Sequence, residues 1–193
     1  KRQNLHDLDN IPFPAWDLVD MENYPLRWLR SSGYFSLNMV TTRGCPFKCN
    51  WCAKPIYGNR YNSRSPENVV KEIKFCLSKF HFDHIWFCDD IFGLKPGWIK
   101  KFSKLVFEEG LIFKFKIQSR VDLLLEEDCI SDLAKAGCDE IWLGAESGSQ
   151  KILDAMDKGT KVEQIYQATD MIKKAGIKPC FFLQFGYPGE IMA

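Results

Sequence analysis

The sequence has no long hydrophobic run and no excess of charge of either sign. Its 26 Lys and Arg residues against 25 Asp and Glu residues leave a formal net charge of +1, which argues against general binding to nucleic acid or to a membrane surface. The apolar runs fall short of the roughly 18 residues that a membrane span needs. The chain does not open with the charged and then apolar segment of a signal peptide. We therefore expect neither a nucleic-acid partner nor a membrane partner.

The composition allows a buried core. Hydrophobic residues make up 46% and charged residues 26% of the sequence, a composition that excludes a disordered chain. The length of 193 residues leaves room for one domain or one and a half. The eight cysteines do not fit a disulfide scaffold, because such proteins are usually small, poor in core and exported. We expect reduced thiols and a cytoplasmic location. Since the sequence opens with Lys1 rather than Met, we expect a fragment of a longer protein.

Residues 1–35 predict a linker or arm, and residues 36–193 a C-terminally truncated domain. Prolines interrupt any helical or strand period in the arm, at Pro12, Pro14 and Pro25. Apolar side chains in the same segment predict that it packs on another surface: Ile11, Phe13 and Trp16.

From Ser36 onward, β-rich segments alternate with helical patterns. The expected strands are Leu37–Thr42, Ile85–Cys88, Phe113–Gln118, Glu140–Gly144 and Pro179–Phe185. The expected helices are Asn68–Phe80, with Ser65 as N-cap, then Pro96–Glu109, Glu126–Ala136 and Val162–Ala175. This alternation predicts right-handed βαβ units in a parallel sheet. A closed barrel needs roughly 250 residues, so the expected fold is α/β, a partial, open and TIM-barrel-like (βα) barrel of about five units.

Three cysteines follow the first expected strand with the spacing C-x3-C-x2-C: Cys45, Cys49 and Cys52. A loop this short cannot wind a helix through all three, so the thiolates can converge on one centre. Three thiolates suit an iron–sulfur cluster or zinc. A structural zinc site usually has four Cys or His ligands, and no second CxxC pair is present. On a four-iron cluster, three thiolates leave one iron open to an outside ligand.

A zinc-stabilised α/β binding module without catalysis is the alternative. The remaining cysteines have no ligand-type spacing: Cys76, Cys88, Cys129, Cys138 and Cys180. For Cys76 and Cys180, in apolar surroundings, we expect small buried apolar residues. His81 and His84 flank the second expected strand and are expected at the surface or at a helix end.

The cysteine motif, with aromatic Trp51 before its last thiol, resembles that of the radical S-adenosylmethionine (SAM) superfamily. The resemblance covers about residues 36–190 and includes further motifs, each at a strand end: Phe87–Phe92, Gln118–Arg120, Gly144–Gly148, and Phe181–Gly186 with Pro188-Gly189-Glu190. Parallel α/β sheets bind ligands at this end of their strands.

The resemblance implies that the three cysteines bind three irons of a [4Fe–4S] cluster and that SAM chelates the fourth. One electron from a donor such as flavodoxin or ferredoxin would then cleave SAM into methionine and a 5′-deoxyadenosyl radical. It also implies a set of SAM-binding residues: Trp51, Asp89, Asp90, Gln118, Arg120, Glu146, Ser147, Gln184 and Gly186. Asp89-Asp90 replaces the Gly-Gly-Glu common in the family, so the group that holds the SAM amine stays open.

Simpler roles stay open for several of these residues. Glu146 can cap the helix that follows it, and Asp89 and Asp90 can cap a turn. Gln118 and Arg120 can be ion-pair or hydrogen-bond partners at the rim of the sheet.

The arm and Cys88–Phe92 together resemble the subgroup with an upstream cobalamin-binding domain. There a proline-rich connector leads into the barrel, as residues 8–18 would here. The resemblance implies cobalamin held by a domain absent from this chain. It also implies methyl transfer, cyclisation or rearrangement of an unidentified substrate, either a small molecule or a modified biomolecule.

Overall fold

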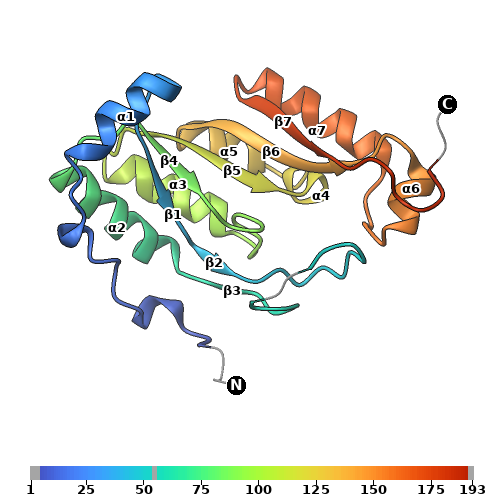
Figure 1. The fold of residues 1–193 in the computed structure, drawn as a ribbon, viewed down its shortest axis with the longest axis horizontal. Helices are drawn as coiled ribbons and strands as arrows, with labels where there is room; N and C mark the ends of the chain where they lie inside the picture. Colours follow the sequence, from blue (N-terminus) through green and yellow to red (C-terminus); the bar gives the residue numbers. More distant parts are fainter. Residues whose placement is uncertain (1–4, 54–55, 191–193) are drawn as a thin grey trace.

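A parallel β-sheet forms the centre of the protein. The computed structural model describes residues 5–53 and 56–190. Five parallel strands lie in the order β1-β4-β5-β6-β7 (Figure 1). Their bounds are Ser36–Met39, His84–Phe87, Lys114–Ser119, Cys138–Glu146 and Lys178–Leu183. The strand order follows the chain, and within the described residues the sheet stays open. The predicted α/β partial barrel is confirmed.

Helices cover one face of this sheet, behind it in Figure 1. The main ones are α2 (Pro66–Lys79), α3 (Trp98–Glu108), α5 (Cys129–Lys135) and α7 (Val162–Lys174). The Ser65 hydroxyl accepts the backbone N–H of Asn68, as its predicted N-cap role requires. Shorter helices, α4 (Val121–Leu124) and α6 (Gln150–Ala155), complete the α/β part.

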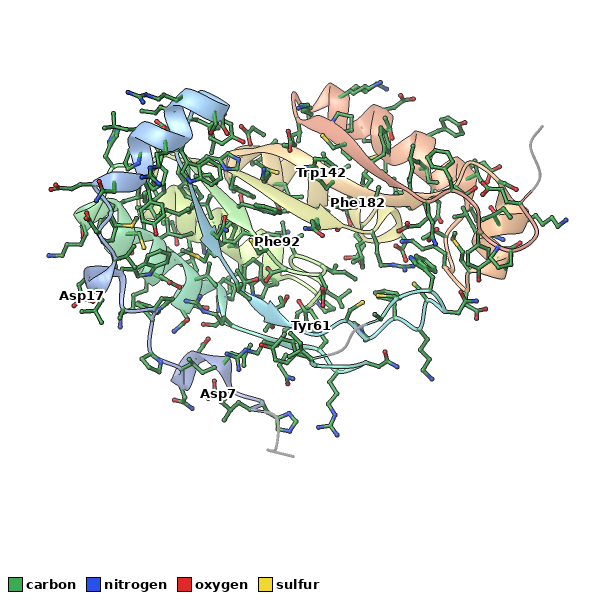
Figure 2. All side chains as sticks on the ribbon, in the orientation of Figure 1. Asp7, Asp17, Tyr61, Phe92, Trp142 and Phe182 are labelled. Carbon is green, nitrogen blue, oxygen red and sulfur yellow. The ribbon has the colours of Figure 1, made fainter. Side chains whose placement is uncertain are left out.

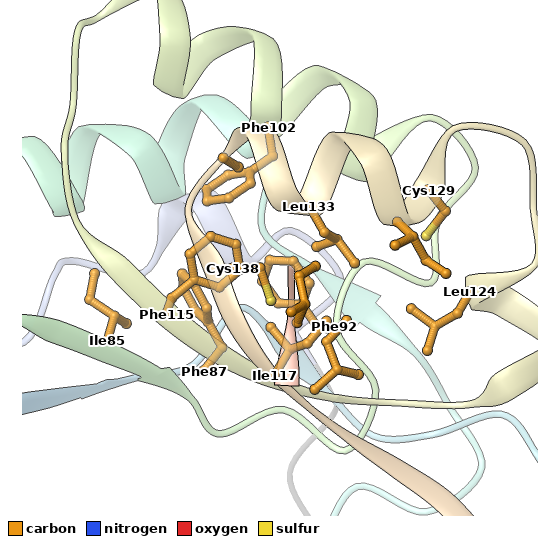
Figure 3. Packing of buried hydrophobic residues seen from close by; sticks show 14 of the residues in the cluster. Ile85, Phe87, Phe92, Phe102, Phe115, Ile117, Leu124, Cys129, Leu133 and Cys138 are labelled. Carbon is orange, nitrogen blue, oxygen red and sulfur yellow. The ribbon is translucent and has the colours of Figure 1, made fainter. Parts of the chain in front are cut away.

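The core lies between the helices and the sheet, and it contains a group of aromatic rings in mutual contact among its aliphatic side chains (Figure 3). Phe92 lies at the centre, with its ring centroid 4.8 Å from that of Phe87 and 5.8 Å from that of Phe102. Phe92 lies five residues after Phe87, the last residue of β4, so this packing anchors the loop that leaves the carboxyl end of the strand. The Phe92 N–H also donates to the carbonyl of Gln118, at the end of β5.

The arm contains a helix, although its prolines were expected to interrupt any helical period. It begins with two 3₁₀ turns, η1 (Leu8–Asn10) and η2 (Trp16–Leu18), and continues into α1 (Asn23–Ser32). The expectation that no periodic element survives there was wrong, because Pro25 lies in the first turn of α1, where its missing N–H is not needed. The arm packs on the domain as predicted, since Leu8 is buried and Trp16 Nε1 donates to Glu72 Oε1 at 2.9 Å.

The expected environment of two residues was wrong. His84 is buried between strands, with Nδ1 2.9 Å from Ser36 Oγ and Nε2 3.3 Å from Asp139 Oδ1. Cys180 is only half-buried, because it lies on β7, at the edge of the sheet. Within the described residues no two cysteines form a disulfide. None of the helices found there is both long enough and apolar enough to cross a bilayer.

Candidate active site at the carboxyl ends of the strands

A cavity of about 230 Å³ lies at the carboxyl ends of β5 and β6, beside the cysteine loop. Most of the residues predicted to bind cluster or cofactor line it: Cys45, Cys49, Trp51, Cys52, Asp90, Gln118, Arg120 and Glu146. They come from positions up to about a hundred residues apart, and the parallel topology brings them to one edge of the sheet.

The cysteine loop is held at both ends by backbone contacts. It lies between β2 (Thr42–Arg43) and β3 (Asn62–Ser63), which pair antiparallel. Gly44 has a φ of 83°, and a Cβ there would lie 2.0 Å from the carbonyl oxygen of Arg60, so only glycine fits. On the other side, Asn50 N–H donates to the carbonyl of Met156 at 3.1 Å. Cys45 and Cys49 are half-buried and Cys52 is exposed.

Arg120 brings a positive charge to this loop. Its guanidinium carbon lies 3.7 Å from the centroid of the Phe47 ring, and its Nη1 lies 3.9 Å from Cys49 Sγ. Asp122 accepts from Nε and Nη2, both at 3.0 Å, and the carbonyl of Lys158 accepts from Nη2 at 2.8 Å. With 5% of its surface exposed, Arg120 is fixed in orientation beside one thiol.

A buried ion pair joins Glu146 to Lys158 across the cavity wall. Lys158 Nζ lies 2.9 Å from Glu146 Oε1, and the two side chains are 6% and 13% exposed. Lys158 Nζ also lies 5.3 Å from the centroid of the Trp51 ring. Glu146 has the left-handed φ of 62°, a strained conformation for a residue other than glycine. Sequence reasoning missed Lys158, which follows a short unpredicted helix and matches no spacing.

The two acidic residues after β4 have different surroundings. Asp89 is buried, and its carboxylate accepts the backbone N–H groups of Thr41 at 2.7 Å and of Thr42 at 2.9 Å, together with the hydroxyl of Thr41. Burial raises the pKa of Asp89 to about 6, although these hydrogen bonds act to lower it. Asp89 therefore ties the end of β4 to the start of the cysteine loop, whereas Asp90 is exposed and lines the cavity.

Besides Asp89, three of the predicted residues are not among those that line the cavity. Ser147 is buried, and its hydroxyl accepts the N–H of Ser149 at 3.1 Å. Gln184 donates its backbone N–H to the carbonyl of Glu146 at 2.9 Å, while its side-chain Oε1 is buried without a hydrogen-bond partner in the described residues. The N–H of Gly186 donates to the carboxylate of Glu190. Sequence reasoning missed Trp142 and Phe182, which line the cavity with ring centroids 5.0 Å apart (Figure 2).

Comparison with protein families identifies this arrangement. The family model for the radical SAM superfamily matches residues 39–193, which include the cysteine loop and all five strand ends. The chain belongs to the radical SAM superfamily. Members of this enzyme superfamily bind a [4Fe–4S] cluster and SAM, as the resemblance of the motifs implied.

Relatives and solved structures match most of the chain. An uncharacterized methyltransferase of Pyrococcus horikoshii is 30% identical over 190 residues, 98% of this chain and 40% of the relative. The cobalamin-dependent SAM radical enzyme OxsB, solved with aqua-cobalamin bound, is 26% identical with a TM-score of 0.68, over 76% of this chain and 23% of that one. The methyltransferase TsrM of Kitasatospora setae shares the fold, with 22% identity, a TM-score of 0.72, and 86% and 33% coverage. The chain thus spans less than half the length of these relatives.

The donor groups around the cavity fit the two cofactors of the superfamily. Three thiols line the same cavity, which suits the sulfur ligation of an iron–sulfur cluster. In residues 5–53 and 56–190, no three Cys, His, Asp or Glu side chains are placed to hold a single metal ion.

Proposed function

We propose that Cys45, Cys49 and Cys52 hold a [4Fe–4S] cluster, that the adjoining cavity holds SAM, and that the protein cleaves SAM reductively. The observation that carries this proposal is that the three thiols and the polar ends of β5 and β6 line one cavity. Bound there, the cluster would supply the electron that splits the S–C5′ bond of SAM into methionine and a 5′-deoxyadenosyl radical.

Charged residues around the cavity match the charged parts of SAM. Asp90 is the carboxylate that we assign to the SAM ammonium, because Asp89 already accepts hydrogen bonds from the chain. Lys158 is the cation that we assign to the SAM carboxylate, and Glu146 its partner and an acceptor for the ribose hydroxyls. We assign Trp51, Gln118, Ser147, Gln184 and Gly186 to the SAM-binding site as well.

Apolar side chains protect the reacting centre. Ile91, Trp142 and Phe182 line the cavity between the polar groups, and Ile91 is buried. Such a wall excludes water and other hydrogen donors from a reactive radical. Arg120 holds Cys49 in place through the contacts described above, so its role is to position that thiol and to set its electrostatic surroundings.

The rest of the proposal concerns the whole protein. We propose methyl transfer, cyclisation or rearrangement of a small molecule or modified biomolecule as the reaction, and the name of the Pyrococcus relative favours methyl transfer. The structural neighbour OxsB supports cobalamin as a further cofactor, held outside this chain. A flavodoxin or ferredoxin would be the electron donor, and reduced thiols suit the cytoplasm. We also propose that residues 1–35 form an arm and that residues 36–193 form the catalytic domain.

Anaerobic reconstitution with iron and sulfide tests the proposal. We expect about four irons and four sulfides per chain, and an electron paramagnetic resonance spectrum of the reduced protein that changes when SAM is added. Cys49→Ala is expected to abolish SAM cleavage, whereas Cys180→Ala, which changes another half-buried thiol, retains the cluster and the activity. Stoichiometric zinc without sulfide would replace this proposal with the zinc-stabilised binding module.

A further inference from the structure

The face of the sheet that the helices leave uncovered is polar and aromatic rather than aliphatic. Side chains alternate between the two faces of a strand, and Phe115 and Ile117 of β5 point into the core under the helices. Lys114, Lys116 and Gln118 therefore point to the opposite, inner face. The interior of a closed barrel is usually filled with branched aliphatic residues. This inner face has a different composition, which calls for a functional explanation.

The strand register arranges the inner residues in layers. One layer runs across all five strands and consists of Asn38, Trp86, Lys116, Glu140 and Lys178. The next layer toward the carboxyl ends contains Gln118 and Trp142, and both line the candidate active-site cavity. Two residues of a strand span roughly 7 Å, so the charged layer lies about that far below the cavity.

Lys116 is the cation of this layer that has no carboxylate within ion-pair distance in the described residues. Its Nζ lies 4.6 Å from the centroid of the Trp86 ring, and it forms no ion pair within the described residues. The neighbouring acid, Glu140, is already engaged, because Trp142 Nε1 donates to its Oε1 at 2.6 Å and Lys178 Nζ to its Oε2 at 3.0 Å. A half-buried ammonium held over an aromatic face, with no carboxylate of its own, is suited to pair with an anion from outside the chain.

Aromatic rings lie between Lys116 and the cavity. Trp142 is in register with Gln118, one layer above Lys116, and its ring centroid lies 5.0 Å from that of Phe182. Flat rings stack on such a pair. A molecule with a negative group at Lys116 and a ring against Trp142 would extend into the cavity that contains the three thiols.

We propose that this inner face binds the substrate and that the substrate is an aromatic carboxylate, its carboxylate on Lys116 and its ring on Trp142 and Phe182. The inference rests on the proposed function, because it assigns the substrate class of that same site. The Lys116 ammonium would bind the carboxylate about one strand layer below the cavity. This contact would determine which end of the substrate faces the radical.

Binding of 2-naphthoate, with 2-naphthamide as its uncharged analogue, tests the inference by isothermal titration calorimetry on the chain without cluster. We expect wild type to bind the acid more tightly than the amide. Lys116→Met, which keeps an apolar stem on Trp86, is expected to weaken binding of the acid about tenfold or more, that is about 1.4 kcal/mol, and to leave the amide unaffected. The control is Lys114→Met, which removes the same charge from the same strand and face one layer farther from the cavity.

Several outcomes would overturn the inference: no saturable binding of the acid by wild type at millimolar concentrations, equal affinity for acid and amide, or an equal loss in the Lys114 variant. Lys116→Gln serves if the Met variant fails to fold. The proposed function is judged separately, by cluster content and by the response to SAM. Lys116→Met is expected to load its cluster and respond to SAM as wild type does.

Discussion

The guanidinium of Arg120 lies against the thiol of Cys49, with 3.9 Å between Nη1 and Sγ. Phe47 covers the face of the guanidinium, and Asp122 and the Lys158 carbonyl hold its nitrogens. One of the three proposed cluster ligands is thus next to a fixed positive charge in a nearly water-free position. A neighbouring positive charge favours the state of a redox centre with one more electron, which for a bound cluster is the reduced state.

Replacement of Arg120 tests this relationship. In the reconstituted protein, Arg120→Met is expected to lower the midpoint potential of the cluster and to slow SAM cleavage by about tenfold. Arg120→Lys keeps the charge but loses the planar contact with Phe47 and the paired donors to Asp122, so it is expected to restore only part of the activity. A redox titration followed by electron paramagnetic resonance measures the potential. An unchanged potential in the Met variant would contradict the assignment.

Asp89 gives a prediction about pH. Burial raises its pKa from the ordinary value of 3.8 to about 6, so the folded state holds this proton more tightly than the unfolded state. The corresponding stabilisation is present below the unfolded pKa and is lost as the pH rises toward 6. Asp89→Asn keeps an oxygen acceptor for the N–H groups of Thr41 and Thr42 and removes the charge.

The free energy of unfolding of the Asn variant, relative to wild type, is therefore expected to rise by about 2 kcal/mol between about pH 4 and about pH 7. Urea unfolding of both proteins at several pH values measures this difference. Asp90→Asn is the matched control, because it makes the same substitution at the adjacent position, which is exposed. A pH-independent difference for Asp89→Asn would mean that Asp89 titrates normally.

The buried pair of Glu146 and Lys158 predicts strong coupling. Lys158→Met leaves an uncompensated carboxylate in a position that is 13% exposed, so we expect a loss of about 3–5 kcal/mol in the free energy of unfolding. The double variant Glu146→Gln, Lys158→Met is expected to recover much of that loss, because it buries no unpaired charge. Denaturant unfolding of wild type, both single variants and the double variant forms a double-mutant cycle, which gives the coupling free energy between the two side chains. Additive losses would show that the two side chains do not interact.

Much of the fold was predictable because its signals are local. Ser65-Pro66 at the start of α2 and the β-rich segments after Ser36 act within a few residues. Once the parallel sheet was predicted, Gln118, Arg120 and Glu146 had to lie at its carboxyl edge, and they line one cavity there.

What the sequence did not reveal depends on tertiary contacts. Lys158 reaches Glu146 only because the segment after α6 folds back against β6, and no periodicity encodes that return. Asp89 and Asp90 are chemically alike, and only the backbone of Thr41 and Thr42 decides that the first one is buried. His84 is a polar residue in a β-rich segment, and its burial depends on Ser36 and Asp139 from neighbouring strands.

Gly144 shows how closely the backbone approaches the proposed SAM site. A Cβ at this position would lie 2.7 Å from Lys158 Nζ and 3.2 Å from Glu146 Oε1. Lys158 Nζ is the end of a flexible side chain, so Gly144→Ala is expected to displace the ion pair at little cost to the fold. We therefore expect affinity for SAM to fall about tenfold, with a thermal melting curve close to that of wild type.

Gly148→Ala is the matched control for this change. It adds the same methyl group four residues later, where a Cβ would meet nothing within 4 Å. Calorimetric titration of the reconstituted proteins with SAM measures both affinities. If the two variants bind SAM equally well, the space beside Gly144 is not where SAM lies, and Glu146 and Lys158 would then serve only to stabilise the end of β6. A loss confined to Gly144→Ala would instead tie SAM binding to the geometry of that ion pair.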